Sequence, residues 1–205
     1  MSVYLTSDLH DGHARIVEYC GRPFRFEEQQ GELVRRWNVV VGPDDVVWIL
    51  GDLSFRRLDP TRAFLEMLHG HKRLVRGNHD SRSMCRKLVE SGHLEAMQDD
   101  AMLALDAGPG PVLCAARHAP DFETPWPAGV RLGLHGHCHE KGWLRRRADG
   151  RYLVNVGVDQ WSFAPVSIVE ILARVEAATD ADVWPSDTAR DVRRGLPSHY
   201  AEARA

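Results

Sequence analysis

The sequence predicts an α/β domain built in layers, with strands and helices alternating early and paired strands following later. Three observations support this prediction. Short apolar runs typical of buried strands alternate with segments of helical spacing through the first half of the chain. The second half consists mainly of apolar runs separated by Gly/Pro and Asp-Gly turns. Five of the apolar runs lead into polar clusters, and sites in α/β proteins form beyond the carboxyl ends of strands.

The first elements follow from their patterns in order. Residues 2–8, "SVYLTSD", are β-rich and end in an acid, which predicts a strand. Residues 12–21 predict a short helix ending at a glycine. Residues 25–41 predict a longer helix because their apolar residues recur at helical spacing, for example at Leu33 and Trp37, before "GPDD" breaks the pattern.

The middle of the chain continues the alternation of strand and helix. Residues 46–52, "VVWILGD", form a continuous apolar run, as expected for a buried strand. A helix is expected over residues 61–70, with Asp59 as its N-cap and Pro60 as its first residue. Residues 72–80 then predict a strand that ends in a polar cluster, and the helix expected next, ending at a glycine, covers residues 81–92.

The later elements are mostly strands. Residues 101–120 predict two strands around a Gly/Pro turn, and residues 130–139 a strand followed by a loop. Residues 145–159 predict a hairpin with an Asp-Gly turn. Residues 165–179 predict a strand that runs directly into a helix.

The length and composition indicate one domain. Of the 205 residues, we expect 1–179 to form that domain and the polar, alanine-rich residues 180–205 to form a C-terminal tail or helix. The net charge of −3 gives no general attraction to nucleic acid, so no stable nucleic-acid complex is expected. The sequence has no membrane-length apolar run, no signal-peptide pattern and no CxxC pair among its four cysteines, which predicts a reduced, cytoplasmic protein.

The polar clusters carry the residues expected to form a site. On an extended chain, residues i and i+2 point to the same side, so Asp8 and His10 are expected to converge, as are His137 and His139. Glycines precede three of the clusters, where they let the backbone turn tightly. Carboxylate, imidazole and amide oxygen together suit Mn, Fe, Ni or Zn. The five clusters are Asp8–His10, Gly51–Asp52, Gly77–Asp80, Arg117–Pro120 and Gly136–His139.

These clusters form the pattern DxH…GD…GNH[DE]…H…GHxH in that order over residues 8–139, and in this the chain resembles the calcineurin-like metallophosphoesterase superfamily. The segments "TSDLHDGHARIVEYCGRPF" and "NVGVDQWSFAPVS" also resemble a small bacterial and phage branch of it. The resemblance implies a four-layer α/β/β/α sandwich of two facing mixed sheets flanked by helices.

The resemblance also implies a centre with two divalent metal ions, of which Mn²⁺ is favoured and Fe, Ni or Zn remain open. By this resemblance Asp52 is expected to bridge the two ions, and a hydroxide between them is expected to be the attacking group. His79 is expected to contact the phosphate and to act as general acid rather than as a ligand. The expected ligands of metal one are Asp8, His10, Asp52 and His139, and those of metal two are Asp52, Asn78, His118 and His137.

The expected activity is hydrolysis of small or cyclic nucleotide phosphodiesters, with 2′,3′-cyclic nucleotides favoured. Two divalent ions against two carboxylates and a hydroxide leave a net positive pocket that matches a diester's single charge. The alternatives are a broad phosphomonoesterase and a catalytically inactive scaffold of the same fold. Phe55 stands where purple acid phosphatases have an iron-binding tyrosine, which argues against that branch. The segment "GDLSFRR" lacks the DRG of serine/threonine protein phosphatases, which argues against a phosphoprotein substrate. Asp11 replaces an aromatic residue that is common in the resembling branch. The residues at the mouth of the pocket, and with them the choice of substrate, therefore do not follow from that resemblance.

Several residues near the motifs have plainer interpretations. Asp80 is expected to support its loop or orient a histidine, and Cys138 to pack away from the metals. His13 either reaches the pocket mouth or merely begins a helix. His135 is expected to be a strand residue. The run Arg145–Arg147 is interpreted as a solvated hairpin, with guidance of a phosphate or nucleic acid as the alternative. Core packing is expected for the tryptophans near the site, with stacking on a base as the alternative, and these are Trp126, Trp143 and Trp161. The sequence leaves the oligomeric state open.

Overall fold

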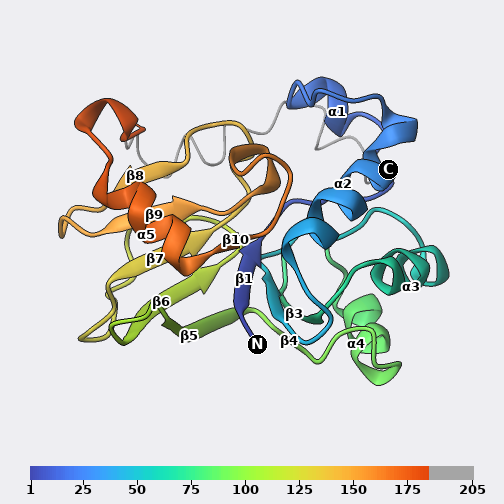
Figure 1. Cartoon of the computed structure of the whole chain (residues 1–205), viewed down its shortest axis with the longest axis horizontal. Coiled ribbons are helices and arrows are strands. Elements are labelled where there is room, and N and C mark those ends of the chain that lie inside the picture. Colours follow the sequence, from blue (N-terminus) through green and yellow to red (C-terminus); the bar gives the residue numbers. More distant parts are fainter. Residues whose placement is uncertain (185–205) are drawn as a thin grey trace.

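A computed structural model describes residues 1–184 of the chain. Its first sheet has the strand order β10-β1-β2-β3-β4 (Figure 1). The four strands β1 to β4 run parallel, and β10 pairs antiparallel with β1 at one edge. The carboxyl ends of β1, β2 and β3 therefore open onto the same edge of the sheet. The strands are β1 (Val3–Thr6), β2 (Val46–Ile49), β3 (His71–Val75), β4 (Ala96–Gln98) and β10 (Val166–Ser167).

The second sheet has the order β5-β6-β7-β9-β8 and is also mixed. Its central strands β6, β7 and β9 are parallel, whereas β5 and β8 pair antiparallel at the two edges. The predicted strand pair at residues 101–120 is the β5–β6 hairpin, and the predicted Asp-Gly hairpin is β8–β9. The strands are β5 (Asp100–Asp106), β6 (Pro111–Arg117), β7 (Leu132–His135), β8 (Leu144–Arg146) and β9 (Tyr152–Asn155).

Helices flank the two sheets, as expected. Helices α2, α3 and α4 lie on the side of the first sheet away from the second (Figure 1). Helix α5 follows β10 and packs Ile168 and Ile171 into the core that both sheets share. The helices are α1 (Ile16–Tyr19), α2 (Phe26–Val40), α3 (Leu58–Met67), α4 (Arg82–Glu90) and α5 (Ile168–Glu176), with 3-10 turns at Val158–Gln160 and Asp180–Asp182.

Two hydrophobic cores follow from strand alternation. Along β2, Val46 and Trp48 face the second sheet, where they meet residues such as Leu103 and Leu134. Val47 and Ile49 face the helices instead. All four β2 side chains are buried because both faces of this strand are covered. The polar loops at the strand ends are thus carried by a rigid frame.

The local structure differs from the sequence prediction at the start of one helix and in one additional strand. Helix α3 begins at Leu58 and its N-cap is Arg57, so Asp59 and Pro60 lie inside the first turn rather than at the cap. Proline is tolerated there because the first N–H groups of a helix have no intrahelical partner anyway. Strand β4 was not predicted, since two of its residues are only partly buried, Gln98 is exposed, and the three form no apolar run.

The arginine run is also different from the solvated hairpin that the sequence predicted. Arg145 is 5% exposed and Arg147 is 6% exposed, and only Arg146 faces solvent. Arg147 stacks on Trp126 with its guanidinium carbon 4.1 Å from the ring centroid, and Arg145 lies over Trp184 at 6.0 Å. Arg145 and Arg147 are therefore buried structural residues that pack against Trp184 and Trp126.

The chain beyond α5 continues against the second sheet. Val183 forms a parallel bridge with Leu144, and the Trp184 amide donates to the Leu144 carbonyl at 2.8 Å. Residues 185–205, most of the predicted tail, lie outside the described residues. The division at residue 180 stays a prediction. Over residues 1–184, no helix is both long and apolar enough to span a bilayer.

Candidate metal centre

All seven side chains predicted to bind metal gather at one edge of the sandwich. They lie on loops that follow the carboxyl ends of strands in both sheets. Loops after β1, β2 and β3 come from the first sheet, and loops after β6 and β7 come from the second. This is the position that parallel strand topology provides for a site. The residues are Asp8, His10, Asp52, Asn78, His118, His137 and His139.

Asp52 occupies the middle of this group. Its Oδ2 atom lies 3.4 Å from His10 Nε2 and 3.3 Å from His118 Nε2. His10 belongs to the first predicted ligand set and His118 to the second. One carboxylate oxygen therefore faces both sets at once, which is the arrangement that a bridging ligand requires.

The first ligand set lies around Asp8. Asp8 Oδ1 is 3.8 Å from His10 Nε2 and 4.0 Å from His139 Nε2, and the three side chains form a group compact enough to hold a cation. His10 is fully buried, yet neither ring nitrogen has a hydrogen-bond partner within residues 1–184. A buried imidazole without partners is costly unless a ligand satisfies it. These donors fit a divalent ion.

The second ligand set is tighter. Asn78 Oδ1 lies 2.8 Å from His118 Nε2 and 2.9 Å from His137 Nδ1, and the two imidazole nitrogens are 3.2 Å apart. Ligand atoms that share an ion at about 2.1 Å lie roughly 3 Å from one another. His118 Nδ1 donates to the Leu50 carbonyl at 2.7 Å, which fixes the tautomer and leaves Nε2 free for a cation.

The backbone conformation of the ligand loops differs from the extended form that the sequence argument assumed. Five of the seven residues have positive φ angles, between 48° and 68°. Their side chains do converge, but through left-handed turns rather than through the alternation of a strand. Each such residue costs roughly 1–2 kcal/mol, which structures tolerate mainly at functional sites. The five residues are Asp8, His10, Asp52, His137 and His139.

The glycines of the motifs are needed mainly for space. A Cβ atom at Gly136 would lie 1.9 Å from Ser7 Oγ and 2.4 Å from Asp8 Oδ2. A Cβ at Gly77 would lie 2.2 Å from Asp52 Oδ1. Neither glycine has a positive φ, so close approach to a carboxylate requires them, whereas Gly51 combines φ +97° with a similar lack of space.

Backbone amides hold both carboxylates in place. The His137 amide donates to Asp8 Oδ2 at 3.0 Å, and the His79 amide donates to Asp52 Oδ1 at 3.0 Å. Asp80 lies behind this loop, where its carboxylate accepts from the amides of Asp52, Leu53 and Gly77. Asp80 therefore supports the loop, as the sequence predicted.

The electrostatics favour cation binding. Burial alone would raise the pKa of Asp8 and Asp52, but the surrounding imidazoles hold both pKa values well below their usual range. Burial opposes a charge on His118, yet Asp52 raises its pKa to about 10. Burial lowers the pKa values of His10 and His137 to about 4, so both rings are neutral at neutral pH, as the binding of a cation requires. A cation would replace the proton on His118.

Two residues that support the site were not predicted as site residues. Asp159 follows β9, and its Oδ2 lies 3.2 Å from His139 Nδ1. Arg22 is 5% exposed and donates to Asp159 Oδ1 at 2.8 Å and to the Asp8 carbonyl at 2.8 Å. Arg22 and Asp159 thus connect the loop of Asp8 to the ring of His139.

His79 lies at the edge of the centre with Phe55 and His13. Its Nε2 is 4.0 Å from Asp52 Oδ2, farther than the Nε2 atoms of His10 and His118. Phe55 stacks on the His10 ring at 5.2 Å and lies 4.6 Å from the His79 ring and 4.2 Å from the His13 ring. His13 therefore reaches the site. Burial lowers its pKa to about 4 and also lowers that of His79.

Three further predictions concern residues beside the centre. Cys138 is 7% exposed and is absent from the compact ligand groups found in residues 1–184. His135 lies in β7 as predicted, and burial lowers its pKa to about 3. Asp11 is fully buried and accepts from Arg56 Nε at 2.7 Å and from Gln30 Nε2 at 2.9 Å. It forms the inner support of the lip rather than its surface.

Comparison with known proteins agrees with the fold and with the family that the motif pattern indicated. The chain matches the family model of calcineurin-like phosphoesterases over residues 1–164, and it belongs to that family. Members are hydrolases that generally bind divalent metal ions.

Relatives of this chain come from an archaeon and from phages. An uncharacterized protein of Methanocaldococcus jannaschii is 31% identical over 182 residues, covering 85% of this chain and 91% of the relative. The gene 66 protein of Mycobacterium phage L5 is 32% identical over 186 residues, covering 78% of this chain and 87% of the relative. A solved structure of a protein of unknown function from Aquifex aeolicus has a TM-score of 0.60 at 22% identity, covering 83% of this chain and 97% of that one, which shows the shared fold.

Proposed function

We propose that this chain is a dinuclear metal-dependent phosphodiesterase acting on small or cyclic nucleotide diesters, with 2′,3′-cyclic nucleotides as favoured substrates. The observation that carries the proposal is the position of Asp52 Oδ2, which lies 3.4 Å from His10 Nε2 and 3.3 Å from His118 Nε2. A single oxygen between two sets of N and O donors is suited to bridge two ions. When bound, such a pair activates water and neutralises charge on a phosphate.

Mn²⁺ is the ion proposed for both positions. The predicted donors are carboxylate, amide and imidazole groups, with no thiolate among them, and this chemistry suits Mn²⁺, with Fe, Ni and Zn as alternatives. The four cysteines form no disulfide, which supports the proposed cytoplasmic location.

The charges around the centre favour a diester over a dianionic monoester. A hollow of about 540 Å³ reaches the second ligand set at Asn78, His118 and His137. Its two arginines are already paired. Arg76 donates to Asp99 at 2.9 Å, and Arg117 contacts Asp100 at 2.8 Å and also Asp121. Neither arginine has a free positive charge with which to bind the second negative charge of a phosphate monoester. A broad phosphomonoesterase is therefore the less favoured alternative.

His79 is proposed to protonate the leaving oxygen. Its side chain is 23% exposed, and its Nε2 lies 4.0 Å from Asp52 Oδ2 without joining any of the three compact groups found among the described residues. An alkoxide needs a proton to leave, and a protonated imidazole can supply it. Because burial lowers the pKa of His79, we expect this general acid to work best on the acid side of neutral pH. An inactive scaffold is the less favoured candidate, because the side chains proposed as ligands lie together at one edge of the sandwich with His79 beside them.

Hydrolysis of bis(p-nitrophenyl) phosphate by the full-length protein tests the proposal. We expect activity that EDTA abolishes and that Mn²⁺ restores better than Fe²⁺, Ni²⁺ or Zn²⁺. A panel of 2′,3′-cyclic nucleotides and simple monoesters then tests the substrate. Full activity in a verified metal-free preparation would contradict the metal mechanism, and a much higher kcat/KM on monoesters would contradict the diester preference.

A further inference from the structure

Phe55 presents an apolar ring to solvent at the edge of the metal centre. It lies on the loop between β2 and α3, shortly after Asp52, and it is 40% exposed. Its ring contacts the imidazoles of His10, His13 and His79. An exposed aromatic side chain therefore adjoins both a proposed ligand of metal one and the proposed general acid.

The contacts with these imidazoles leave one face of the Phe55 ring open. His10 stacks on the ring, with its centroid 5.2 Å away and an angle of 28° between the two planes. The His79 centroid is 4.6 Å from that of Phe55 and only 5.7 Å from that of His10, whereas a ring on the far face of Phe55 would lie much farther from His10. The same holds for His13, which lies 4.2 Å from Phe55 and 5.7 Å from His10. The face of Phe55 that points away from His10 is thus covered by none of the three imidazoles.

The position of Phe55 is fixed by the loop after β1. The Phe55 amide donates to the Asp11 carbonyl at 2.8 Å, and Ser54 and Asp11 form a parallel β-bridge. Asp11 is fully buried, and its carboxylate accepts from Arg56 Nε at 2.7 Å. These contacts hold the residues on both sides of Phe55. Little conformational entropy is therefore lost when a ligand contacts the ring, which favours binding.

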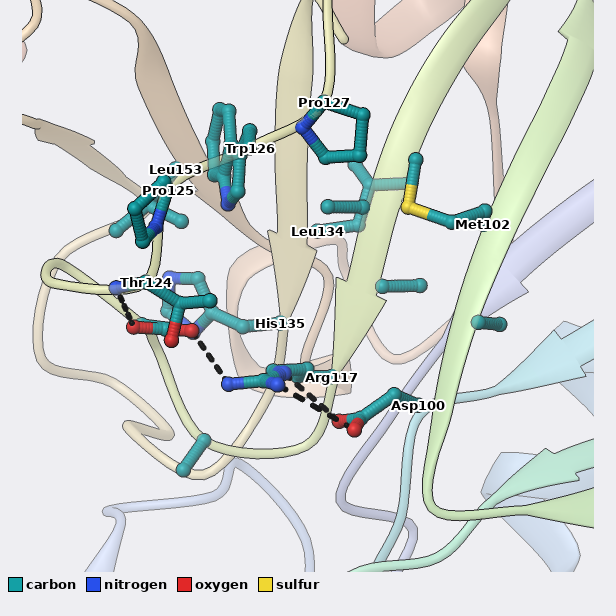
Figure 2. Close-up of a pocket in the computed structure, with 15 residues that line it drawn as sticks. Asp100, Met102, Arg117, Thr124, Pro125, Trp126, Pro127, Leu134, His135 and Leu153 are labelled. Carbon is teal, nitrogen blue, oxygen red and sulfur yellow. Dashed lines mark hydrogen bonds and ion pairs between the residues drawn. The ribbon is translucent and has the colours of Figure 1, made fainter.

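The tryptophans that the sequence offered as alternative stacking surfaces are already in contact with arginines. Figure 2 shows Trp126 on the second sheet, where prolines flank it in the chain. Two arginine guanidinium groups lie over this ring, at 4.1 Å and 4.7 Å from its centroid. The guanidinium of Arg174 lies over Trp143 at 4.1 Å and over Trp161 at 4.7 Å. Among these aromatic residues, Phe55 offers the ring surface that is open and adjoins the proposed ligands.

We propose that Phe55 is a specificity-determining residue on which a planar ring of the substrate stacks. This inference rests on the proposed phosphodiesterase function, under which His79 protonates the leaving oxygen, and the His79 ring centroid is 4.6 Å from that of Phe55. The group bonded to the leaving oxygen then extends beside the open face of Phe55. An aromatic ring gains more from such a contact than an aliphatic group of the same size. The substrates are accordingly diesters whose leaving group carries a ring, such as a nucleoside with its base.

Binding of phosphonates to the Mn²⁺-loaded full-length protein tests the ring separately from turnover, because ester hydrolysis cannot cleave their C–P bond. Phenylphosphonate and cyclohexylphosphonate share the same charged group and are similar in size, but only the first carries a flat aromatic ring. Isothermal titration is expected to show phenylphosphonate bound more tightly by roughly two- to tenfold. Phe55→Leu should remove this preference, and Phe55→Trp should keep it. Phe122→Leu, the same change beside the second ligand set, is the matched control and should also keep it.

Three results of this titration would overturn the role of Phe55. They are equal affinities of the two phosphonates for the wild type, a preference that survives in Phe55→Leu, or a preference that is lost in Phe122→Leu instead. The wild-type comparison needs no variant, so it decides even if Phe55→Leu fails to fold. Metal analysis and circular dichroism establish that each variant keeps its metal and its fold.

Kinetics separate this inference from the proposed function. Both 2′,3′-cyclic AMP and ethylene phosphate contain a strained cyclic diester, and only the nucleotide carries a base. Phe55→Leu should raise KM for the nucleotide by roughly two- to tenfold, with kcat and the KM for ethylene phosphate nearly unchanged. If neither diester is hydrolysed while the phenyl preference depends on Phe55, the phosphodiesterase function is wrong and ring binding at Phe55 stands. If both are hydrolysed and Phe55→Leu changes neither KM, the role of Phe55 is wrong and the function stands.

Discussion

The carboxylate of Asp159 lies 3.2 Å from Nδ1 of His139, on the side of the ring opposite the metal centre. The same carboxylate is held by Arg22 through two hydrogen bonds, at 2.8 Å and 3.1 Å. Burial alone would raise the pKa of Asp159, but His139 and Arg22 hold it below its usual value. A charged carboxylate behind the ring orients His139, and it also makes Nε2 a stronger donor to a cation.

Replacing Asp159 should therefore weaken metal binding without removing a ligand. We expect Asp159→Asn to lower the affinity for Mn²⁺ by roughly 10- to 100-fold, since the amide keeps the shape but loses the charge. Calorimetric titration of metal-depleted protein measures this. Asp59→Asn, at a surface ion pair, is the control and should be unchanged. Wild-type affinity in Asp159→Asn would show that Asp159 has only a structural role.

Gly136 should tolerate no side chain. In Gly136→Ala the new Cβ would overlap Ser7 and Asp8, so we expect a loss of roughly 1–3 kcal/mol in the free energy of unfolding together with lower metal content. Gly31→Ala is the matched control, because Gly31 lies inside α2 and a Cβ added there would meet no atom within 4 Å. That change should stabilise the protein by about 0.5–1 kcal/mol. Equal effects of the two changes in denaturant unfolding would disprove the steric explanation.

Cys138 should be dispensable for metal binding. It lies between His137 and His139 but is buried outside the compact ligand groups of the described residues. We expect Cys138→Ser to retain its bound metal and most of its activity, which elemental analysis and a diester assay check together. Loss of one metal ion from this variant would show that the thiol is a ligand.

His79 should matter for chemistry and not for metal content. General acid catalysis is typically worth ~10²–10⁴-fold, so His79→Ala should lose roughly that factor in kcat on a diester with an alkyl leaving group. The loss should be much smaller for bis(p-nitrophenyl) phosphate, because nitrophenolate leaves without a proton. Metal analysis and circular dichroism should match the wild type.

The general-acid role of His79 has a clear contrary result. If His79→Ala slows both kinds of leaving group equally, His79 positions the phosphate instead. If the variant loses metal, His79 is a ligand and the division of roles at this loop is wrong.

Much of the fold could be predicted from the sequence because most of its strands are apolar runs bounded by turn residues. β2 is apolar at every position, and its apolar run continues through Leu50 to Gly51–Asp52, so strand and site residue are recognised together. The hairpins were equally clear, since turn residues separate their strands. β4 could not be found, because Ala96–Gln98 is held in the sheet by pairing with β3 rather than by an apolar pattern of its own.

The predicted ligands converge, but the local geometry could not be derived from strand alternation. Asp8 and His10 have φ angles of 59° and 50°, so each turns left-handed, and the amides of both are bonded to the loop after β2. Such strained conformations depend on the surrounding structure and leave no periodic signal in sequence.

The supporting residues illustrate what sequence reasoning missed. Asp159 follows an apolar strand as Asp8 and Asp52 do, and this signal could have singled it out. Arg22 had no comparable signal, because its partner Asp159 is 137 residues away along the chain. The burial of Arg145 and Arg147 was hidden for the same reason, since the aromatic rings beside them, Trp184 and Trp126, come from other segments.

The metal content of Asp52→Ala tests the dinuclear centre most directly. Both proteins are loaded with Mn²⁺, freed of excess metal and analysed for bound metal per chain, with circular dichroism to confirm that the variant is folded. Because Asp52 Oδ2 faces both ligand sets, we expect two bound ions in the wild type and a loss at both positions in the variant, together with loss of diester hydrolysis. Two tightly bound ions in folded Asp52→Ala would contradict the bridging role.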